Sequence, residues 1–89
     1  MSLSRAGKGE KTVSISSVSK ITGIEVYTLR YWEREFPEYL NPPRTEGGQR
    51  RYRPSDIQKV FTLKRLLREE MFSIAGARKY LRNAIRDVA

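Results

Sequence analysis

A glycine between two short amphipathic segments constrains the fold of this chain more than any other sequence feature. Before Gly23, apolar residues recur at helical spacing at Ile15, Val18 and Ile21. Ser14 can cap the helix that this spacing predicts. Gly23 can adopt a positive φ and end that helix, after which a second helix runs to about Phe36. Two helices joined by a tight glycine turn predict a helix-turn-helix.

The second helix, residues 25–36, has two unlike faces. At about 100° per residue, one narrow sector carries the apolar residues Leu29, Trp32 and Phe36. The opposite sector carries Tyr27, Arg30, Tyr31 and Arg34. Guanidinium groups pair with phosphate oxygens, and phenol hydroxyls donate to them, so this face suits a nucleic-acid backbone. The alternative is a solvated surface helix whose aromatic side chains pack against a neighbouring element.

Composition narrows the classes of function. The 89 residues include no cysteine and no histidine, which excludes disulfides, thiolate chemistry, most zinc sites and the usual general base. We therefore expect no catalysis, no cofactor and no metal. Lys and Arg number 18 against 10 Asp and Glu, and the net charge of +8 favours polyanionic partners. Without a membrane-spanning run or a signal-peptide pattern, we expect a cytoplasmic protein with no membrane partner.

The rest of the chain predicts one domain with a basic hairpin. Residues 1–12 lack apolar periodicity and predict a disordered tail before a single domain over 13–89. Pro37 ends the second helix. In the segment 44–53, a Gly-Gly pair predicts a hairpin turn between two short arms. Its arginines are a second candidate contact with phosphate, the alternative being a solvated, charged turn.

Two further helices complete the predicted core. Pro54 opens a third helix, whose broad apolar stripe consists of Ile57, Val60, Phe61, Leu63, Leu66 and Leu67. Its charged residues are expected to form a solvated face: Lys59, Lys64, Arg65 and Arg68. Ser73 can cap a fourth helix, whose apolar stripe either packs on the third helix or contacts a partner helix. The predicted fold is mainly α, a winged helix-turn-helix with four helices and a small two-stranded wing hairpin.

Several short motifs together resemble one protein family. They are Thr22-Gly23-Ile24, Thr28-Leu29-Arg30-Tyr31-Trp32-Glu33, Pro43-Arg44, Gly48-Gln49-Arg50-Arg51-Tyr52 and Asp56-Ile57. In this order and spacing, the string from residue 15 to residue 81 resembles the N-terminal DNA-binding domain of MerR-type bacterial transcription regulators. The sequence departs from the family at Trp32, where a Tyr is usual, at Glu25, where a capping Ser is usual, and at Met71, where Gly is frequent.

The resemblance implies roles for particular residues. The second helix would enter the major groove, while the wing, residues 44–53, would reach the flanking backbone. By position, the residues nearest the base edges would be Glu25, Val26 and Tyr27. The implied phosphate contacts are Arg30, Tyr31 and Arg34 on the helix and Arg44, Arg50, Arg51 and Tyr52 on the wing. Weaker candidates on the first helix are Ser17 and Lys20.

The resemblance also implies partners that lie beyond this chain. Family members bind a pseudo-palindromic promoter operator on double-stranded DNA as homodimers and affect RNA polymerase indirectly, at the nucleoid. We expect this chain to be the DNA-binding domain of such a regulator, without its dimerisation helix and effector domain. Two alternatives remain: an architectural or recombination-associated DNA-binding module of the same fold, and a protein-interaction domain that docks an acidic partner.

Overall fold

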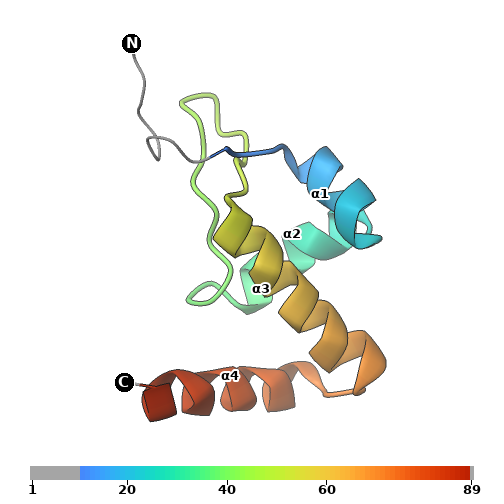
Figure 1. The fold of residues 1–89 in the computed structure, drawn as a ribbon, viewed down its shortest axis with the longest axis vertical. Helices are drawn as coiled ribbons and strands as arrows, with labels where there is room; N and C mark the ends of the chain where they lie inside the picture. Colours follow the sequence, from blue (N-terminus) through green and yellow to red (C-terminus); the bar gives the residue numbers. More distant parts are fainter. Residues whose placement is uncertain (1–10, 89) are drawn as a thin grey trace.

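The computed structural model describes residues 11–88, and the architecture of this part is mainly helical. In chain order the helices are α1 (Ile15–Thr22), α2 (Val26–Glu35), α3 (Pro54–Lys64), the π-helical η1 (Arg65–Glu69) and α4 (Ile74–Val88). Figure 1 shows α1 and α2 beside the upper part of α3, with α4 lying across its lower end. The four predicted α-helices are therefore confirmed. None of the helices in the described part of the chain is long and apolar enough to cross a bilayer.

The turn between α1 and α2 forms as the sequence predicts. The side chain of Ser14 caps α1 by accepting a hydrogen bond from the backbone N–H of Ser17 at 3.2 Å. Gly23 then adopts a φ of 79°, which ends α1 with little steric cost because glycine has no Cβ. A contact from outside the motif holds the turn in place, since Lys64 Nζ on α3 donates to the carbonyl oxygen of Thr22 at 2.8 Å.

One hydrophobic core connects all of these elements. Its buried apolar residues are Val18, Ile24, Leu29, Trp32, Phe36, Leu40, Tyr52, Val60, Leu63, Leu66, Ala77 and Leu81. The apolar face predicted for α2 is thus buried, and the stripe on α4 packs into the same core through Ala77 and Leu81. The prediction for Phe61 is wrong, because its side chain is 40% exposed. Phe61 lies next to the buried Val60 on α3, so the helix turns it away from the core.

Different features define the two ends of α3. Pro54 is the first helical residue, as predicted, and the buried Asp56 accepts hydrogen bonds from both the backbone N–H and the guanidinium of Arg53. At its other end α3 widens into η1, which the sequence did not predict. Met71 follows at a φ of 59°, the left-handed region that favours glycine. Met71 therefore adopts a backbone conformation that costs glycine less than a residue with a Cβ.

The segment 44–53, here named the arginine loop, forms no strand in the described part of the chain, so the two-stranded hairpin is not confirmed. Its arms meet at one isolated antiparallel bridge, between Arg44 and Arg50. A turn closes the tip, where the backbone N–H of Gly48 donates to the carbonyl of Thr45 at 2.9 Å and Gly48 has a φ of 87°. The ladder cannot extend past the bridge through Pro42 and Pro43, because proline has no backbone N–H to donate.

The predicted N-terminal tail, residues 1–12, lies mostly outside the described residues. The last residue of that range, Thr12, is joined to the domain because it accepts two hydrogen bonds from the Arg51 side chain. The next residue, Val13, exchanges two backbone hydrogen bonds with Tyr52, at 2.9 and 2.8 Å. The folded domain therefore includes contacts from Thr12 onward.

Candidate nucleic-acid interface

The outer face of α2 presents cations and phenols to solvent. Tyr27 is 72% exposed, and Arg30, Tyr31 and Arg34 are exposed as well. This orientation follows from helical spacing, because Leu29 and Trp32 on the same helix are buried in the core. The guanidinium of Arg34 lies 5.8 Å from the centre of the Tyr31 ring. Within residues 11–88, neither Arg30 nor Arg34 forms an ion pair, so both cations are available to an anionic ligand.

The N-terminal end of α2 is less open than its middle. Glu25 occupies the N-cap position in an extended backbone conformation, but its side chain makes no capping hydrogen bond. Its carboxylate instead accepts from Thr28 Oγ1 at 3.1 Å and from Arg68 Nη2 at 3.0 Å. A hydrogen bond from its own backbone N–H, followed by the Arg68 guanidinium, lowers the pKa of Glu25. The carboxylate is thus directed toward η1 and engaged within the protein. Val26 is half-buried, so of the three predicted base readers Tyr27 is the most open.

The two candidates on α1 are unlike each other. Ser17 is half-buried, and its hydroxyl accepts a hydrogen bond from Ser14 Oγ at 3.2 Å. Lys20 is exposed, and no hydrogen bond or ion pair engages it within residues 11–88. Of the two, Lys20 is therefore the free cation on α1.

The arginines of the loop are engaged inside the protein. Arg44 Nη2 lies 3.5 Å from the Glu33 carboxylate, and Arg50 Nε donates to the same carboxylate at 2.5 Å. Arg51 donates to the hydroxyl of Thr12 at 3.2 Å and to its carbonyl at 3.1 Å. Exposure differs among them, since Arg44 is exposed whereas Arg50 and Arg51 are half-buried. Arg44 is therefore the predicted loop contact that is most accessible to a phosphate.

The position of Tyr52 contradicts its predicted role as a phosphate contact. The side chain is fully buried in the core, and its hydroxyl donates to Glu33 Oε2 at 2.5 Å. Burial raises the pKa of the Tyr52 phenol, and the hydrogen bond to Glu33 raises it further. The sequence prediction failed because the alternation along the loop turns Tyr52 inward, to pair with Val13 and fill the space beside α2.

Glu33 is the residue at this site whose role sequence reasoning missed. It belongs to the motif that carries the family resemblance, but the sequence pattern predicts no function for it. Its place on α2, four residues after the buried Leu29, was the available signal, because residues four apart share a helix face. The side chain is only 8% exposed, and its carboxylate forms ion pairs with Arg44 and Arg50 and accepts a hydrogen bond from the Tyr52 hydroxyl.

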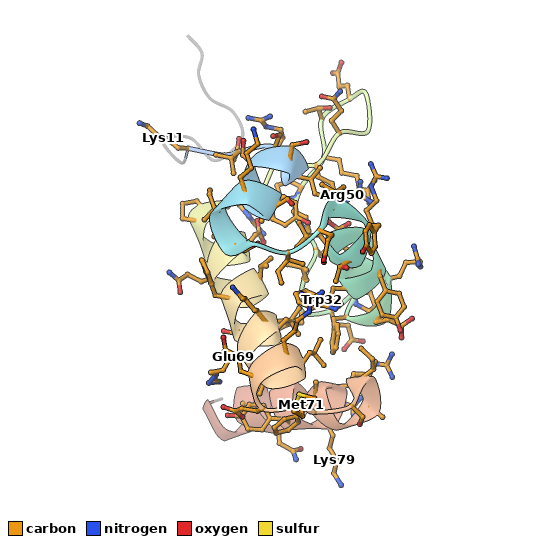
Figure 2. The ribbon with its side chains drawn as sticks, turned by 90° about the vertical axis from the view of Figure 1, so that its right-hand side faces the viewer. Lys11, Trp32, Arg50, Glu69, Met71 and Lys79 are labelled. Carbon is orange, nitrogen blue, oxygen red and sulfur yellow. The ribbon has the colours of Figure 1, made fainter. Side chains whose placement is uncertain are left out.

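The arginine loop and α2 lie on the same side of the molecule. Figure 2 shows the loop projecting above α2, with Arg50 between the two and α3 on the opposite side. The ion pair from Arg50 to Glu33 joins these elements directly. The exposed face of α2 and the loop can therefore meet one extended ligand together.

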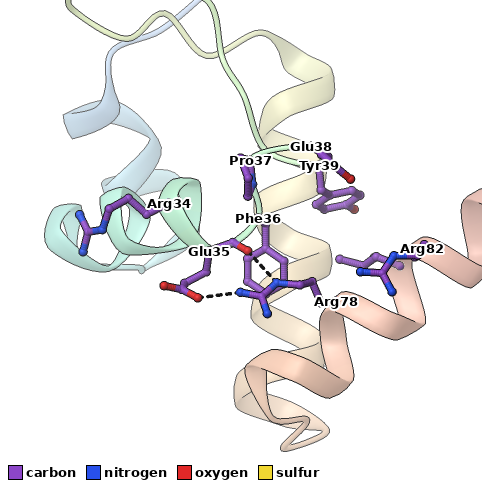
Figure 3. Close-up of a pocket in the computed structure, with 9 residues that line it drawn as sticks. Arg34, Glu35, Phe36, Pro37, Glu38, Tyr39, Arg78 and Arg82 are labelled. Carbon is purple, nitrogen blue, oxygen red and sulfur yellow. Dashed lines mark hydrogen bonds and ion pairs between the residues drawn. The ribbon is translucent and has the colours of Figure 1, made fainter.

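A cavity of about 490 Å³ lies at the other end of α2, between its last turn and α4 (Figure 3). Arg78 of α4 crosses it, lying 6.0 Å from the centre of the Phe36 ring. The same guanidinium donates to the carbonyl of Glu35 at 3.1 Å and to its carboxylate at 2.7 Å. Together with the pair between Arg68 and Glu25, this contact attaches both ends of α2 to the C-terminal half of the domain.

Comparison with known proteins gives this geometry a family context. Residues 13–84 match the family model described as MerR HTH family regulatory protein. The chain is 36% identical over 67 residues to the HTH-type transcriptional repressor CarA of Myxococcus xanthus, and 36% identical over 72 residues to CarH, a repressor of the same organism. These alignments cover 74% and 81% of this chain, but 23% of each relative. The chain thus spans about a quarter of the length of these relatives.

A third relative and a solved structure agree with the first two. The HTH-type transcriptional regulator TnrA of Bacillus subtilis (strain 168) is 32% identical over 56 residues, which cover 63% of this chain and 49% of TnrA. The fold is also similar to the crystal structure of HiNmlR, a MerR family regulator lacking the sensor domain, bound to promoter DNA. That match has a TM-score of 0.67 and 27% identity, and it covers 83% of this chain and 57% of the other.

Proposed function

The chain belongs to the MerR helix-turn-helix family of regulatory proteins, and from this premise we propose how it binds double-stranded DNA. In this proposal α2 enters the major groove, and the arginine loop is the wing that lies along the flanking backbone. The observation that carries the proposal is the exposed cationic face of α2, which lies on the same side as the loop and whose Arg30 and Arg34 form no ion pair within residues 11–88. An α-helix with such a face fits the major groove, which is wide enough to admit it.

Within the α2 face, the residues take different roles. Tyr27 lies in the first turn of α2 and is the most open of the predicted base readers, so we assign it contact with base edges. Arg30, Tyr31 and Arg34 follow along the same face, where guanidinium and phenol groups suit phosphate oxygens. Lys20 and Arg44 would add phosphate contacts from α1 and from the loop. We assign no direct DNA contact to the predicted residues that are half-buried or bonded within the protein, and these residues hold the interface in place instead. They are Ser17, Glu25, Val26, Arg50 and Arg51.

The regulator as a whole would act as a homodimer. A dimer places two copies of α2 on half-sites of a pseudo-palindromic operator, about one helical turn or a multiple of a turn apart. By distorting the DNA between the two recognition elements of a promoter, the bound dimer would affect RNA polymerase indirectly. Because its partner is chromosomal DNA, the protein would act in the cytoplasm at the nucleoid, as a binding protein and not as an enzyme. The relatives, which are transcriptional regulators, support this proposal.

A salt titration tests the proposal. The chain would select a duplex from a random-sequence library, and its affinity for that duplex and for a scrambled one would be measured at several salt concentrations. Each phosphate that a cation neutralises contributes about −0.9 to the slope of log K against log salt concentration. An affinity that is independent of salt, or no binding at low salt, would contradict the proposal. Equal affinity for both duplexes would instead favour an architectural module that binds DNA without sequence preference.

Replacing Arg30 by Ala tests the phosphate role of the α2 face. We expect binding to the selected and scrambled duplexes to weaken by a similar factor, about 5- to 10-fold, with the salt slope shallower by about 0.9. The matched control is Lys79→Ala, which removes an exposed cation that points away from α2 in Figure 2. A loss for Lys79→Ala equal to that for Arg30→Ala would mean that total charge matters and the α2 face does not.

Replacing Tyr27 by Ala tests the assignment of a base reader. We expect the preferred base at one or two positions of each half-site to change, by about 1–3 kcal/mol of discrimination, while affinity for scrambled DNA stays nearly constant. Repeating the library selection with the variant measures this change. An equal loss on every sequence would assign Tyr27 to the backbone.

A further inference from the structure

We propose that Glu33 is a positioning residue for DNA recognition: it fixes the arginine loop to α2, so that both elements meet one duplex as a rigid unit. The inference rests on the proposed function and adds a residue that does not itself contact DNA. Four observations carry it: the burial of the carboxylate, the use of both its oxygens, the place of its partners in the loop, and the charge that it neutralises.

The Glu33 carboxylate is fully engaged in the protein. Oε1 accepts from Arg50 Nε at 2.5 Å and lies 3.5 Å from Arg44 Nη2, while Oε2 accepts from the Tyr52 hydroxyl at 2.5 Å. The side chain of Glu33 is 8% exposed and that of Arg50 is 17% exposed. A carboxylate with this little access to water holds its partners strongly, because water competes weakly for them. It is therefore a fixed point and not a fluctuating surface pair.

The partners of Glu33 lie on both arms of the loop. Arg44 begins the loop, and Arg50 and Tyr52 lie on its returning arm. The arms share one isolated bridge with each other, and Tyr52 forms a second one with Val13. Neither bridge includes α2, so this short backbone pairing does not by itself fix the loop against that helix. The bonds to a single carboxylate on α2 supply the orientation that the missing strand ladder would otherwise give.

Charge gives Glu33 a second effect on the loop. Arg44, Arg50 and Arg51 are close in sequence, and Arg30 lies one helical turn before Glu33 on α2. Without an anion among them, these cations would repel one another and move the loop away from α2. Glu33 neutralises part of this charge and holds Arg50 back from the phosphates. Arg44 is exposed and lies farther from the Glu33 carboxylate, at 3.5 Å, so it is the loop arginine that can exchange this contact for a DNA phosphate.

This arrangement links specificity to the position of the loop. A wing held at a fixed distance from α2 can contact phosphate only when α2 lies in its proper register in the major groove. On a wrong sequence α2 does not take that register, so the protein loses contacts from both α2 and the wing. A wing that was not fixed to α2 could contact the DNA backbone of any sequence. Glu33 therefore contributes to the ratio of specific to non-specific affinity, although neither of its oxygens is free to touch a base.

The test compares Glu33→Gln with a matched control on the same helix, Glu35→Gln. Glutamine keeps the size of the side chain and removes the charge in both variants. Glu35 pairs with Arg78, far from the loop, and so controls for loss of a negative charge on α2. Affinities for the selected and scrambled duplexes would be measured against salt, at a temperature where circular dichroism shows each variant fully folded.

For Glu33→Gln we expect the ratio of selected to scrambled affinity to fall about 10-fold, which corresponds to the contribution of one recognised base pair. We also expect the slope of log K against log salt to steepen by up to about 0.9, because Arg50 becomes available to a phosphate. Glu35→Gln should keep both quantities within twofold of wild type. A folded Glu33→Gln protein with the wild-type ratio and slope would overturn the proposal and leave Glu33 a purely structural residue.

A second variant serves if Glu33→Gln does not fold. Tyr52→Phe removes one donor to Glu33 and leaves its charge and both arginines in place. We expect a smaller fall in the affinity ratio, about 3-fold, without a change in the salt slope; an unchanged ratio would overturn the proposal. Wild-type protein that binds no duplex at low salt would instead contradict the proposed function, so the two failures are distinguishable.

Discussion

The exposed face of α2 and the arginine loop both carry arginine and tyrosine side chains, but these side chains are engaged differently. On α2, Arg30 and Arg34 reach solvent without an ion pair in the described part of the chain. In the loop, Arg50 is engaged by the Glu33 carboxylate and Arg51 by Thr12. Residues 26–35 carry two Arg and two Glu, whereas residues 44–53 carry four Arg and one Glu. The less basic segment is nevertheless the one whose arginines form no ion pair in the described part of the chain.

The difference arises from what supports each region. Hydrogen bonds within α2 fix its backbone, so its outer side chains are not needed to hold the structure. The arginine loop has a closing turn and two isolated bridges, Arg44 with Arg50 and Tyr52 with Val13, but neither bridge includes α2, so side chains hold the loop against that helix instead. An arginine used to support the backbone is less available to a ligand, because binding would first have to break the internal contact. A cation therefore has to be judged by its partners and not by its charge alone.

The largest expected effect on this comparison comes from Arg50→Ala. Removing the guanidinium leaves the nearly buried Glu33 carboxylate with fewer partners, which should lower the free energy of unfolding by about 2–3 kcal/mol. Arg30→Ala is the matched control, because the side chain that it removes forms no ion pair in the described part of the chain, and it should change stability by no more than about 0.5 kcal/mol. Urea unfolding followed by circular dichroism measures both. Equal stability losses would abolish the distinction between the two regions.

Tyr52→Phe should have the next largest effect. The variant keeps the buried ring and removes the hydroxyl that donates to Glu33, a hydrogen bond to a charged group, so unfolding should become easier by about 1.5–3 kcal/mol. If Tyr52 contacted phosphate instead, the same substitution would leave stability unchanged and make the salt slope of DNA binding shallower. Denaturant unfolding and DNA titration on one preparation separate these outcomes.

The effect of Tyr52→Phe should also depend on pH. The folded state raises the pKa of the Tyr52 phenol above its ordinary value of 10.0, so its stabilising contribution is complete below that pH. Above it, the unfolded chain loses the phenol proton while the folded protein keeps it, and stability falls as pH rises. The difference between wild type and Tyr52→Phe should therefore shrink above pH 10, as measured by urea unfolding between pH 7 and 11. A constant difference would contradict burial of the phenol.

Substitutions at two glycines with positive φ should have the smallest effects on stability. Because each adds only a Cβ atom, they test how rigid the backbone of each region is. Gly23→Ala should destabilise the protein by about 1–2 kcal/mol, because the turn is held between α1, α2 and Lys64 and cannot relax. Gly48→Ala imposes a similar strain, but an added Cβ there meets no atom within 4 Å and the loop tip is exposed, so we expect less than about 1 kcal/mol. Thermal unfolding measures both, and a larger loss at Gly48 would mean that the loop is the more rigid region.

Much of the fold could be predicted because its signals are local. Ser14 caps α1, Gly23 ends it and Pro54 opens α3, each through the backbone chemistry of one residue. Ser73 likewise accepts a hydrogen bond from the backbone N–H of Gly76 in the first turn of α4. The two faces of α2 follow from spacing, since a helix turns by a fixed angle per residue. These features needed no knowledge of distant segments.

Predictions that depended on distant partners succeeded less often. Lys64 and Arg68 were expected on a solvated face, but they contact Thr22 and Glu25 respectively and hold the helix-turn-helix against α3 and η1. The two-stranded hairpin was expected from its turn residues, yet Pro42 and Pro43 limit it to a single bridge. The contacts of Lys64 and Arg68 join residues 42 and 43 positions apart in the sequence, whereas the limit on the hairpin comes from the prolines themselves.

By itself, the sequence determined the helices, the glycine turn and the cationic face of α2, because periodicity and capping act over a few neighbouring residues. Only the tertiary structure decided which arginines are free, that Tyr52 lies inside the core, and that Glu33 joins the loop to α2. The physical reason is that burial and ion pairing depend on distances between segments, whereas helix formation depends on spacing within one segment.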